Sequence, residues 1–378
     1  MDDRQRVVWS EGLFLTPQHF QQWDRYVESR LQHGLRIGRG HLHGVADVAF
    51  DPDALLTGTL QLVRCRGILP DGQLIEIPNL DPAPAARAIS DRLAATKERV
   101  GVYLAVPLVR PGSPSVSPSG QLDGRATRWR MHTVHVTDDT RAGSPAREVI
   151  AAVKNVRLAL DGDDLEDHVT VKVAEVARKA TGEPTLVEAY VPPCFELSAS
   201  PPLMGLLRRL IEILGSRAAE LATQRRQRGT GLIDVTASDA AIFQFLHTLN
   251  GALPALQHYF AQPKVHPETV YLSLATLAGQ LFTFATEGHP RDVPAYQHDN
   301  LAGTFGRLAE VIQRLLGTVI ATRCVSIPLK RGADTIFTGS ITDDRLLADA
   351  TFFVAASANV PKEKLMHELP IKSKISSR

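Results

Sequence analysis

The period of the apolar residues changes near residue 198 of this 378-residue chain, and this change constrains the fold more than any other feature. Before it, apolar and polar residues alternate in short runs bounded by turn residues, which is typical of β-strands. After it, leucines recur at spacings of four and three over segments of helical length. From residue 323 short strand-like runs return. The order predicts an α+β protein with a strand domain, a helical domain and a small mixed domain.

The first part, residues 1–195, is expected to be an antiparallel β-sandwich, because many short alternating runs pack best as two layers. The expected strands lie in residues 59–78, which include a Pro-Asp-Gly turn, and in residues 100–109, 128–136, 153–160, 168–173 and 185–191. Residues 110–128 are rich in Ser, Pro and Gly and contain few apolar side chains. They are therefore predicted to form an exposed, flexible loop.

The second part, residues 196–321, is expected to be a four-helix bundle. Ser200 is a candidate N-cap of the first helix, Pro254 should kink the second, and His266 and Asp299 stand near the starts of the third and fourth. The central seam of the bundle is expected to contain Leu246, Leu253, Leu256, Leu308, Ile312 and Leu315. Residues 322–378 are expected to form a small mixed α/β domain that is incomplete, because roughly sixty residues lie near the lower limit for an independent core.

Composition excludes several classes of protein. Lys and Arg total 42 against 41 Asp and Glu, so the net charge of +1 gives no field that would gather nucleic acid. Cys65, Cys194 and Cys324 are far apart, which predicts free thiols in the cytoplasm instead of disulfides or a thiolate metal site. No window contains eighteen consecutive apolar residues and the N-terminus lacks a signal-peptide pattern, so we expect neither membrane insertion nor export.

Three groups of side chains invite a metal hypothesis. Glu11, His19 and Asp24 lie close together in sequence, but His19 has no second histidine four residues away, as a helical zinc site requires. His41 and His43 would share one face of a strand without a carboxylate or cysteine beside them, which favours a solvated polar position. The acidic residues 161–168 lack the glycine and glutamate positions of an EF-hand and are predicted to form a polar turn. We expect no metal and no cofactor.

Signatures of an enzyme are also missing. The sequence contains no nucleophile elbow, phosphate-binding loop or dinucleotide fingerprint. His247, His258, His266 and His289 are expected on polar helix faces or at helix ends. The alternative hypothesis is an enzyme or carbohydrate-binding sandwich with a helical oligomerisation stalk. It requires facing carboxylates or an aromatic platform, and the strand runs offer few of either.

Two long stretches resemble the TssK family, the trimeric baseplate component of the bacterial type VI secretion system. The first is VVWSEGLFLTPQHFQQWDRYVE, residues 7–28, and the second is LNGALPALQHYFAQPKVHPETVYLSLATLAGQLFTF, residues 249–284. Matching residues in the first are Trp9, Ser10, Glu11, Gly12, Phe14, Leu15, Pro17, Gln18, His19, Phe20, Gln21, Asp24, Arg25 and Tyr26. Matching residues in the second are Leu249, Asn250, Pro254, His266, Pro267, Glu268, Tyr271, Leu274, Leu277, Ala278, Gly279 and Leu281.

The resemblance implies a β-sandwich shoulder related to phage receptor-binding proteins, a helical neck and a C-terminal head that is shorter here than in the family. It implies a non-enzymatic adaptor, working as a homotrimer at the cytoplasmic face of the inner membrane. The shoulder would bind the wedge proteins TssF and TssG, and the head would face the TssJ, TssL and TssM membrane complex, with contacts weakened by its length.

The family motif at the N-terminus also receives an interpretation from this resemblance. Glu11, His19 and Asp24 would act as polar contacts that fix the N-terminal segment against the sandwich, the neck or a neighbouring subunit. Phe14, Phe20 and Trp23 would supply apolar burial at the same place.

Overall fold

The computed structural model describes residues 5–38, 40–90, 92–93, 98–141, 143–227 and 237–317, with short stretches between 327 and 374. It divides into two compact units, Met1–Ala321 and Thr322–Arg378. Among the described residues, no helix combines the length and the apolar character that crossing a membrane requires.

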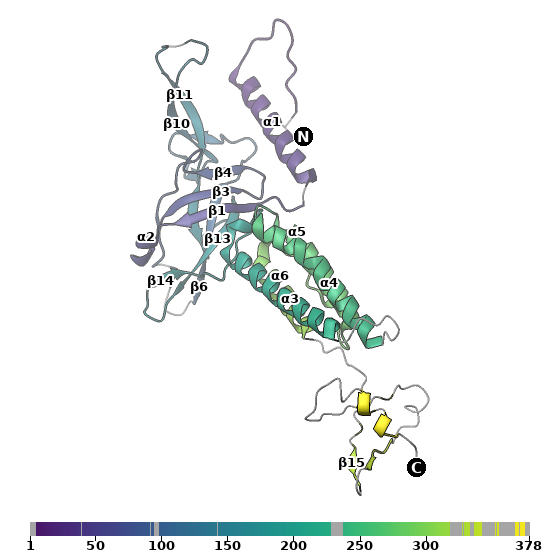
Figure 1. The fold of residues 1–378 in the computed structure, drawn as a ribbon. Helices are drawn as coiled ribbons and strands as arrows, with labels where there is room; N and C mark the ends of the chain where they lie inside the picture. The colour runs from purple at the N-terminus through teal and green to yellow at the C-terminus, as the bar shows by residue number, and fades with distance from the viewer. Residues whose placement is uncertain are drawn as a thin grey trace. The chain divides into compact units, whose positions relative to one another are not determined.

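The first unit begins with a long helix, α1 (Pro17–Gly38), and continues into a strand-rich part (Figure 1). This part contains the short helix α2 (Pro52–Leu56) and strands β1 (Gly44–Phe50), β2 (Thr59–Leu60), β3 (Leu62–Ile68), β4 (Leu74–Ile77), β5 (Arg87–Ala88), β6 (Arg99–Pro107), β7 (Val116–Ser117), β8 (Gln121–Leu122), β9 (Arg125–Ala126), β10 (Trp129–Val136), β11 (Arg147–Lys154), β12 (Arg157–Leu160), β13 (His168–Arg178) and β14 (Pro184–Leu186).

Two sheets enclose the core of the strand-rich part. One has the order β1-β3-β4 and the other β12-β6-β13-β14, and the pairs within both are antiparallel. Strand β3 turns into β4 at the predicted Pro-Asp-Gly sequence, where Gly72 has a φ of 90° that favours glycine. Leu62 and Ile77 of the first sheet and Leu104 and Val171 of the second belong to one buried cluster. The predicted α+β class is confirmed, and two antiparallel sheets before the helices are consistent with the predicted sandwich.

A third sheet contains a two-stranded ribbon, β10–β11, with the short β7 pairing parallel to β10. The predicted exposure of residues 110–128 is confirmed at 111–114 and 121–126, but the segment also contains the short strands β7, β8 and β9, and Ser117, Thr127 and Arg128 are buried. Periodicity missed them because their burial depends on polar contacts. Two strand predictions also need correction: residues 153–160 belong to two strands, and only the beginning of 185–191 is a strand.

The helical part is a four-helix bundle, as predicted. Its helices are α3 (Pro201–Gln227), α4 (Ala237–Ala261), α5 (Pro267–Leu281) and α6 (Leu301–Leu316), with short 3-10 turns η1 (Leu197–Ala199), η2 (Phe282–Phe284), η3 (Pro290–Asp292) and η4 (His298–Asn300). Helix α3 packs on α4 and α6, and α5 packs on the same two helices (Figure 1). Helix α4 is continuous through Pro254. The predicted seam is buried at Leu246, Leu256, Leu308, Ile312 and Leu315, and Leu253 packs against it half-buried.

The second unit is described only in part. Strands β15 (Lys330–Arg331) and β16 (Phe337–Thr338) form an antiparallel pair, and residues 367–369 are helical. Most of the small mixed domain expected for residues 322–378 lies outside the described residues, including nearly all of 342–366.

Candidate interaction surfaces

Helix α1 carries an apolar stripe on its surface. Phe20, Trp23, Val27, Leu31 and Leu35 recur at spacings of three and four, which places them on one helix face. Their exposed fractions lie between 39% and 64%, and α1 has no buried residue. A helix of this pattern normally turns its apolar face toward a core. The described part of the chain leaves this stripe exposed.

The segment before α1 extends the stripe. The Trp9 ring lies 6.3 Å from the Phe20 ring and 6.5 Å from the Trp23 ring, measured between centroids. At the helix start, the backbone N–H of Thr16 donates to Nδ1 of His19 over 3.2 Å. His19 therefore caps its own helix, while Trp9 adds a third large aromatic ring beside the stripe.

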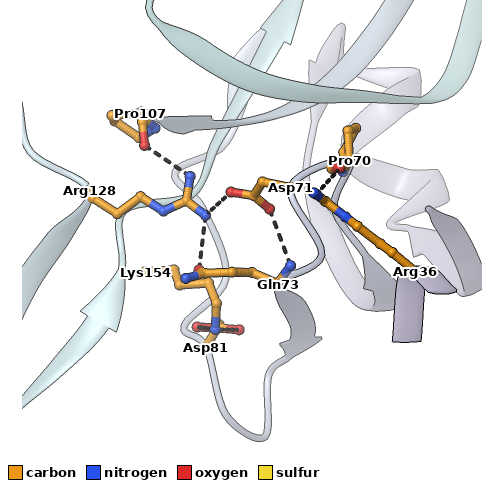
Figure 2. A network of polar contacts seen from close by, with 8 residues as sticks. All are labelled: Arg36, Pro70, Asp71, Gln73, Asp81, Pro107, Arg128 and Lys154. Atoms are coloured by element: carbon orange, nitrogen blue, oxygen red, sulfur yellow. Dashed lines mark hydrogen bonds and ion pairs between the residues drawn. The ribbon is translucent and has the colours of Figure 1, made fainter. Parts of the chain in front are cut away.

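Polar residues of α1 make its contacts with the sandwich. Nη2 of Arg36 donates to the carbonyl oxygen of Pro70 over 2.9 Å, in the turn between β3 and β4 (Figure 2). The Gln32 side chain lies against Gly72, where an added Cβ would come within 3.2 Å of it. A cavity of about 180 Å³ remains between these residues, Leu35 and the segment before β1. The helix is thus attached through Gln32 and Arg36, and of the stripe residues only Leu35 lines this cavity.

A buried cation fixes the turn on which α1 rests. Arg128 is 2% exposed, and its guanidinium donates to Asp71 Oδ2 over 2.5 Å, to Gln73 Oε1 over 2.9 Å and to the Pro107 carbonyl over 3.0 Å. Figure 2 shows these bonds converging between the β3–β4 turn and the start of β10. The network ties the ribbon β10–β11 to the support of α1.

A second buried pair lies beside it. Nζ of Lys154 donates to Asp81 over 3.2 Å, and the Asp81 side chain is 2% exposed (Figure 2). Burial and the neighbouring Asp24 raise the pKa of Glu28 on α1, whereas the positive charges of Lys154 and Arg128 act in the opposite direction. Glu28 therefore lies within the electrostatic reach of both buried cations.

The N-terminal family motif is not a compact cluster. Ser10, Glu11 and Gly12 lie before the helix, and the structure brings neither Glu11 nor Asp24 into a described hydrogen bond or ion pair with His19. The other motif residues, which are exposed or half-buried, are Leu15, Pro17, Gln18, Gln21, Arg25 and Tyr26. The expected burial of Phe14, Phe20 and Trp23 is wrong within the described chain, where their exposed fractions are 83%, 49% and 48%. Burial against a neighbouring subunit stays a prediction.

The neck motif lies in α4 and α5. Leu249, Leu274, Leu277, Ala278 and Leu281 are buried in the bundle. The Tyr271 hydroxyl donates to the Pro294 carbonyl over 2.7 Å. His266, Pro267 and Glu268 lie at the start of α5. Gly279 is half-buried, and Asn250 and Pro254 are exposed.

A groove of about 430 Å³ runs between α4 and α5. Small residues, including Gly251 and Ala255, line it together with Leu272, which is 59% exposed. Polar residues such as His247, Thr276 and Gln280 line it as well, so the groove has a mixed character.

Histidines gather where the sandwich meets the bundle. His41 and His43 precede β1, His266 caps α5, and His298 lies in η4 before α6. The expectation that His41 and His43 are solvated was wrong, because both are half-buried against the ring of His298. The placement of His266 at a helix end was correct. Sequence reasoning missed this group because His298 and His266 are more than 220 positions from their partners.

The acidic residues 161–168 form the predicted turn between β12 and β13. Asp161 accepts hydrogen bonds from the Gly101 N–H over 2.7 Å and the Tyr103 hydroxyl over 2.9 Å. Asp163 pairs with Arg92 over 2.9 Å. Within the described ranges, no group of three or more His, Cys, Asp or Glu side chains is arranged to hold a metal ion. The carboxylates of Asp161 and Asp163 thus tie the turn to β6 and to Arg92.

Comparison with known proteins gives a consistent assignment. A family model described as bacterial type VI secretion, EvfL, ImpJ, VasE matches residues 19–378. The type VI secretion system baseplate component TssK1 of Pseudomonas aeruginosa is 35% identical over 376 residues, which are 98% of this chain and 82% of that protein. The chain belongs to the TssK family.

Solved structures share the TssK fold. A chain of the TssK–TssF–TssG baseplate subcomplex, seen by cryo-electron microscopy, is 31% identical with a TM-score of 0.73 and covers 82% of this chain and 99% of its own length. A chain of the type VI baseplate complex is 31% identical with a TM-score of 0.79 and covers 98% of this chain and 82% of its own length. A crystal structure of TssK, 24% identical with a TM-score of 0.76 over 96% of this chain and 81% of that one, agrees in fold.

Proposed function

We propose that this chain is a non-enzymatic adaptor of the type VI secretion baseplate that works as a homotrimer. The observation that carries the proposal is the apolar stripe of α1, exposed in a member of a family of baseplate components. Contiguous exposed apolar surfaces on folded proteins mark interaction sites. Fully burying each large side chain of the stripe would contribute about 1.5–3 kcal/mol.

The three parts of the chain would divide the work. Residues 1–195 would be a shoulder similar to that of phage receptor-binding proteins and would hold TssF and TssG. Residues 196–321 would be the neck, and residues 322–378 the head, facing TssJ, TssL and TssM at the cytoplasmic side of the inner membrane. Support comes from family membership and from a TssK-fold relative that occurs in a complex with TssF and TssG.

We assign the stripe to contact with a neighbouring subunit. The bond from Arg36 to Pro70 and the contact of Gln32 with Gly72 hold α1 to the sandwich by other side chains, so the stripe is presented in a fixed position. A presented helix face loses little conformational entropy on association. The ridge of aromatic and aliphatic side chains suits a heterologous contact that closes a ring of three copies.

Light scattering of the full chain tests this assignment. The unmodified chain should have the mass of three copies, and Leu31→Glu should reduce it toward one copy without changing the circular dichroism spectrum, because Leu31 is 64% exposed. Gln21→Glu adds the same charge to α1 outside the stripe and should keep the trimer. A monomeric unmodified chain, or a Leu31→Glu trimer, would contradict the assignment.

Co-purification tests the adaptor role. The full chain should retain TssF and TssG, and a chain ending at residue 321 should retain them equally while losing TssL and TssM. If the shortened chain lost TssG and kept TssL, the roles of shoulder and head would have to be exchanged.

A further inference from the structure

The contact between the sandwich and the bundle is made in part by stacked imidazole rings. The His298 ring lies parallel to the His41 ring at 5.1 Å and to the His266 ring at 5.4 Å, measured between centroids. The His43 ring meets His298 edge-on at 4.8 Å. We call His41, His43, His266 and His298 the histidine joint. Two members come from the segment between α1 and β1, and two come from the starts of neck elements.

The hydrogen bonds of the joint place protons on its rings, and one of them requires a neutral His266. Nε2 of His266 lies 2.8 Å from the His41 carbonyl oxygen, and Nε2 of His298 lies 2.7 Å from that of His43. A carbonyl oxygen only accepts, so each Nε2 carries a proton. Nδ1 of His266 accepts the N–H of Glu268 over 3.2 Å and therefore carries none.

The second nitrogen of His298 faces a hydroxyl group, which can donate or accept. The Tyr296 hydroxyl lies 2.8 Å from Nδ1 of His298 and can donate its proton there. Burial, with the nearby rings of His43, His266 and His41, lowers the pKa of His298 to about 4, although its bond to the His43 carbonyl acts the other way. His298 is 3% exposed, so water has little access to a charged ring.

Several other titratable groups surround the joint in the described part of the chain. Asp299 is bonded to Nε2 of His43 over 2.8 Å and has a side chain that is 79% exposed. On the sandwich side, burial raises the pKa of Cys194 to about 12 and also raises that of Tyr190, so both are uncharged at neutral pH. Burial raises the pKa of Tyr296, and the negative charge of Glu268 in α5 raises it further. The Tyr271 ring packs on the Tyr296 ring at 5.2 Å.

We propose that the histidine joint is a proton-sensitive contact that holds the segment entering β1 against the starts of α5 and α6, and that opens when His266 or His298 gains a proton. A proton from solvent would bind Nδ1, the nitrogen that now accepts. On His266 this proton would point at the Glu268 N–H, so that two hydrogen-bond donors would face each other. On His298 it would place a positive charge between two stacked rings. The first change removes the N-cap bond of α5, and both changes place a positive charge on a ring that is almost fully buried.

This device acts on the position of α1. Residues 40–43 connect α1 to β1, and their carbonyl oxygens are the acceptors of both cross-joint bonds. Opening the joint therefore frees the connection of α1 to the neck, while Arg36 still binds the β3–β4 turn. The proposal does not depend on the adaptor role or on the number of subunits.

Amide hydrogen exchange of the full chain between pH 7.5 and pH 5 tests the joint, after correction for intrinsic exchange. The amides of Val45 and Glu268, which lie at its two sides, should lose protection about tenfold per pH unit below about 6.5, the slope for uptake of one proton on opening. Amides at residues 207–214 in α3 serve as the internal reference, and their protection from exchange should not fall in this way. An equal response in α3 would overturn the proposal, as would no response at Val45 and Glu268.

Two variants identify the titrating groups. His298→Gln removes the titration, and His266→Asn does so while keeping an N-cap acceptor for Glu268. Each should flatten the pH response at the joint, and His258→Gln, an exposed histidine of α4, should leave it unchanged. If His298→Gln fails to fold, His266→Asn still decides, because its response must be smaller than that of the unmodified chain. A full response in both folded variants would overturn the proposal.

Discussion

Arg128 and Asp81 are charged side chains with exposed fractions of only 2% each. An unpaired charge in such a position is strongly unfavourable. Arg128 is held by Asp71, Gln73 and a backbone carbonyl, and Asp81 is held by Lys154. Both groups are therefore stable only as members of their networks, and removing one partner should cost more than a surface ion pair contributes.

Asp81→Asn tests this expectation. The substitution leaves the charge of Lys154, whose side chain is 14% exposed, without its carboxylate, and should lower the free energy of unfolding by about 3–5 kcal/mol. Urea unfolding followed by tryptophan fluorescence measures the change. Arg64→Gln is the matched control, because it breaks an ion pair at the surface, in which the Arg64 side chain is 58% exposed and that of Asp47 is 36% exposed. This substitution should change the free energy of unfolding by no more than about 1 kcal/mol. Equal losses would show that burial of the pair is immaterial.

His298 predicts a pH dependence of stability. Its pKa in the folded chain is about 4, below the ordinary 6.5, so the unfolded chain binds more protons between these values. The free energy of unfolding should therefore be highest above pH 6.5 and should fall as the pH drops toward 4, by up to about 3 kcal/mol from this group. Urea unfolding at pH 7 and pH 5 should show a smaller difference for His298→Gln than for the unmodified chain. The same difference in both would assign the dependence to other groups.

At the scale of elements, local signals predicted the structure wherever neighbouring residues decide it. The turn at Pro70, the start of α5 at His266 and the seam through Leu246 follow from backbone preferences and spacing. The side of α1 that contacts the sandwich could not be predicted in this way, because it depends on residues of the sandwich that are distant in sequence. Arg128 and the histidine joint were missed for a related reason: their burial rests on partners far away in sequence.

The bundle seam gives a prediction of its own. Leu249 in α4 is fully buried, so Leu249→Ala should lower the free energy of unfolding by about 2–5 kcal/mol through lost transfer energy and a cavity. Leu272→Ala in α5 removes the same atoms at a position that is 59% exposed and should cost under about 1 kcal/mol. Thermal unfolding followed by circular dichroism compares the two. Similar losses would place Leu272 in a contact that the single chain does not show.

At the scale of the whole molecule, the sandwich and the bundle share one buried core. Val45 and Leu104 of the sandwich belong to the same cluster as Leu214 and Phe305 of the bundle. Backbone bonds strengthen the junction, since the Leu197 N–H donates to the Val265 carbonyl over 2.9 Å. The first compact unit, Met1–Ala321, should therefore unfold as one cooperative body.

Truncation tests this expectation. A chain ending at residue 321 should keep the main thermal transition of the full chain, because its core is complete. A chain ending at residue 298 lacks α6, which supplies Leu301, Phe305, Leu308 and Ile312 to the core, and should lose the transition. Scanning calorimetry distinguishes the outcomes. A large drop in the midpoint of the first chain would mean that residues 322–378 contribute to the stability of the first unit.

The orientation of α1 has a consequence for the life of the protein in a cell. A chain that leaves the ribosome alone presents a row of aromatic and aliphatic side chains to chaperones and proteases, which recognise such surfaces. An assembled chain would not present them. Exposure of this helix would therefore mark copies of the protein that have not assembled with the chain that covers the stripe. Such surplus copies would be degraded.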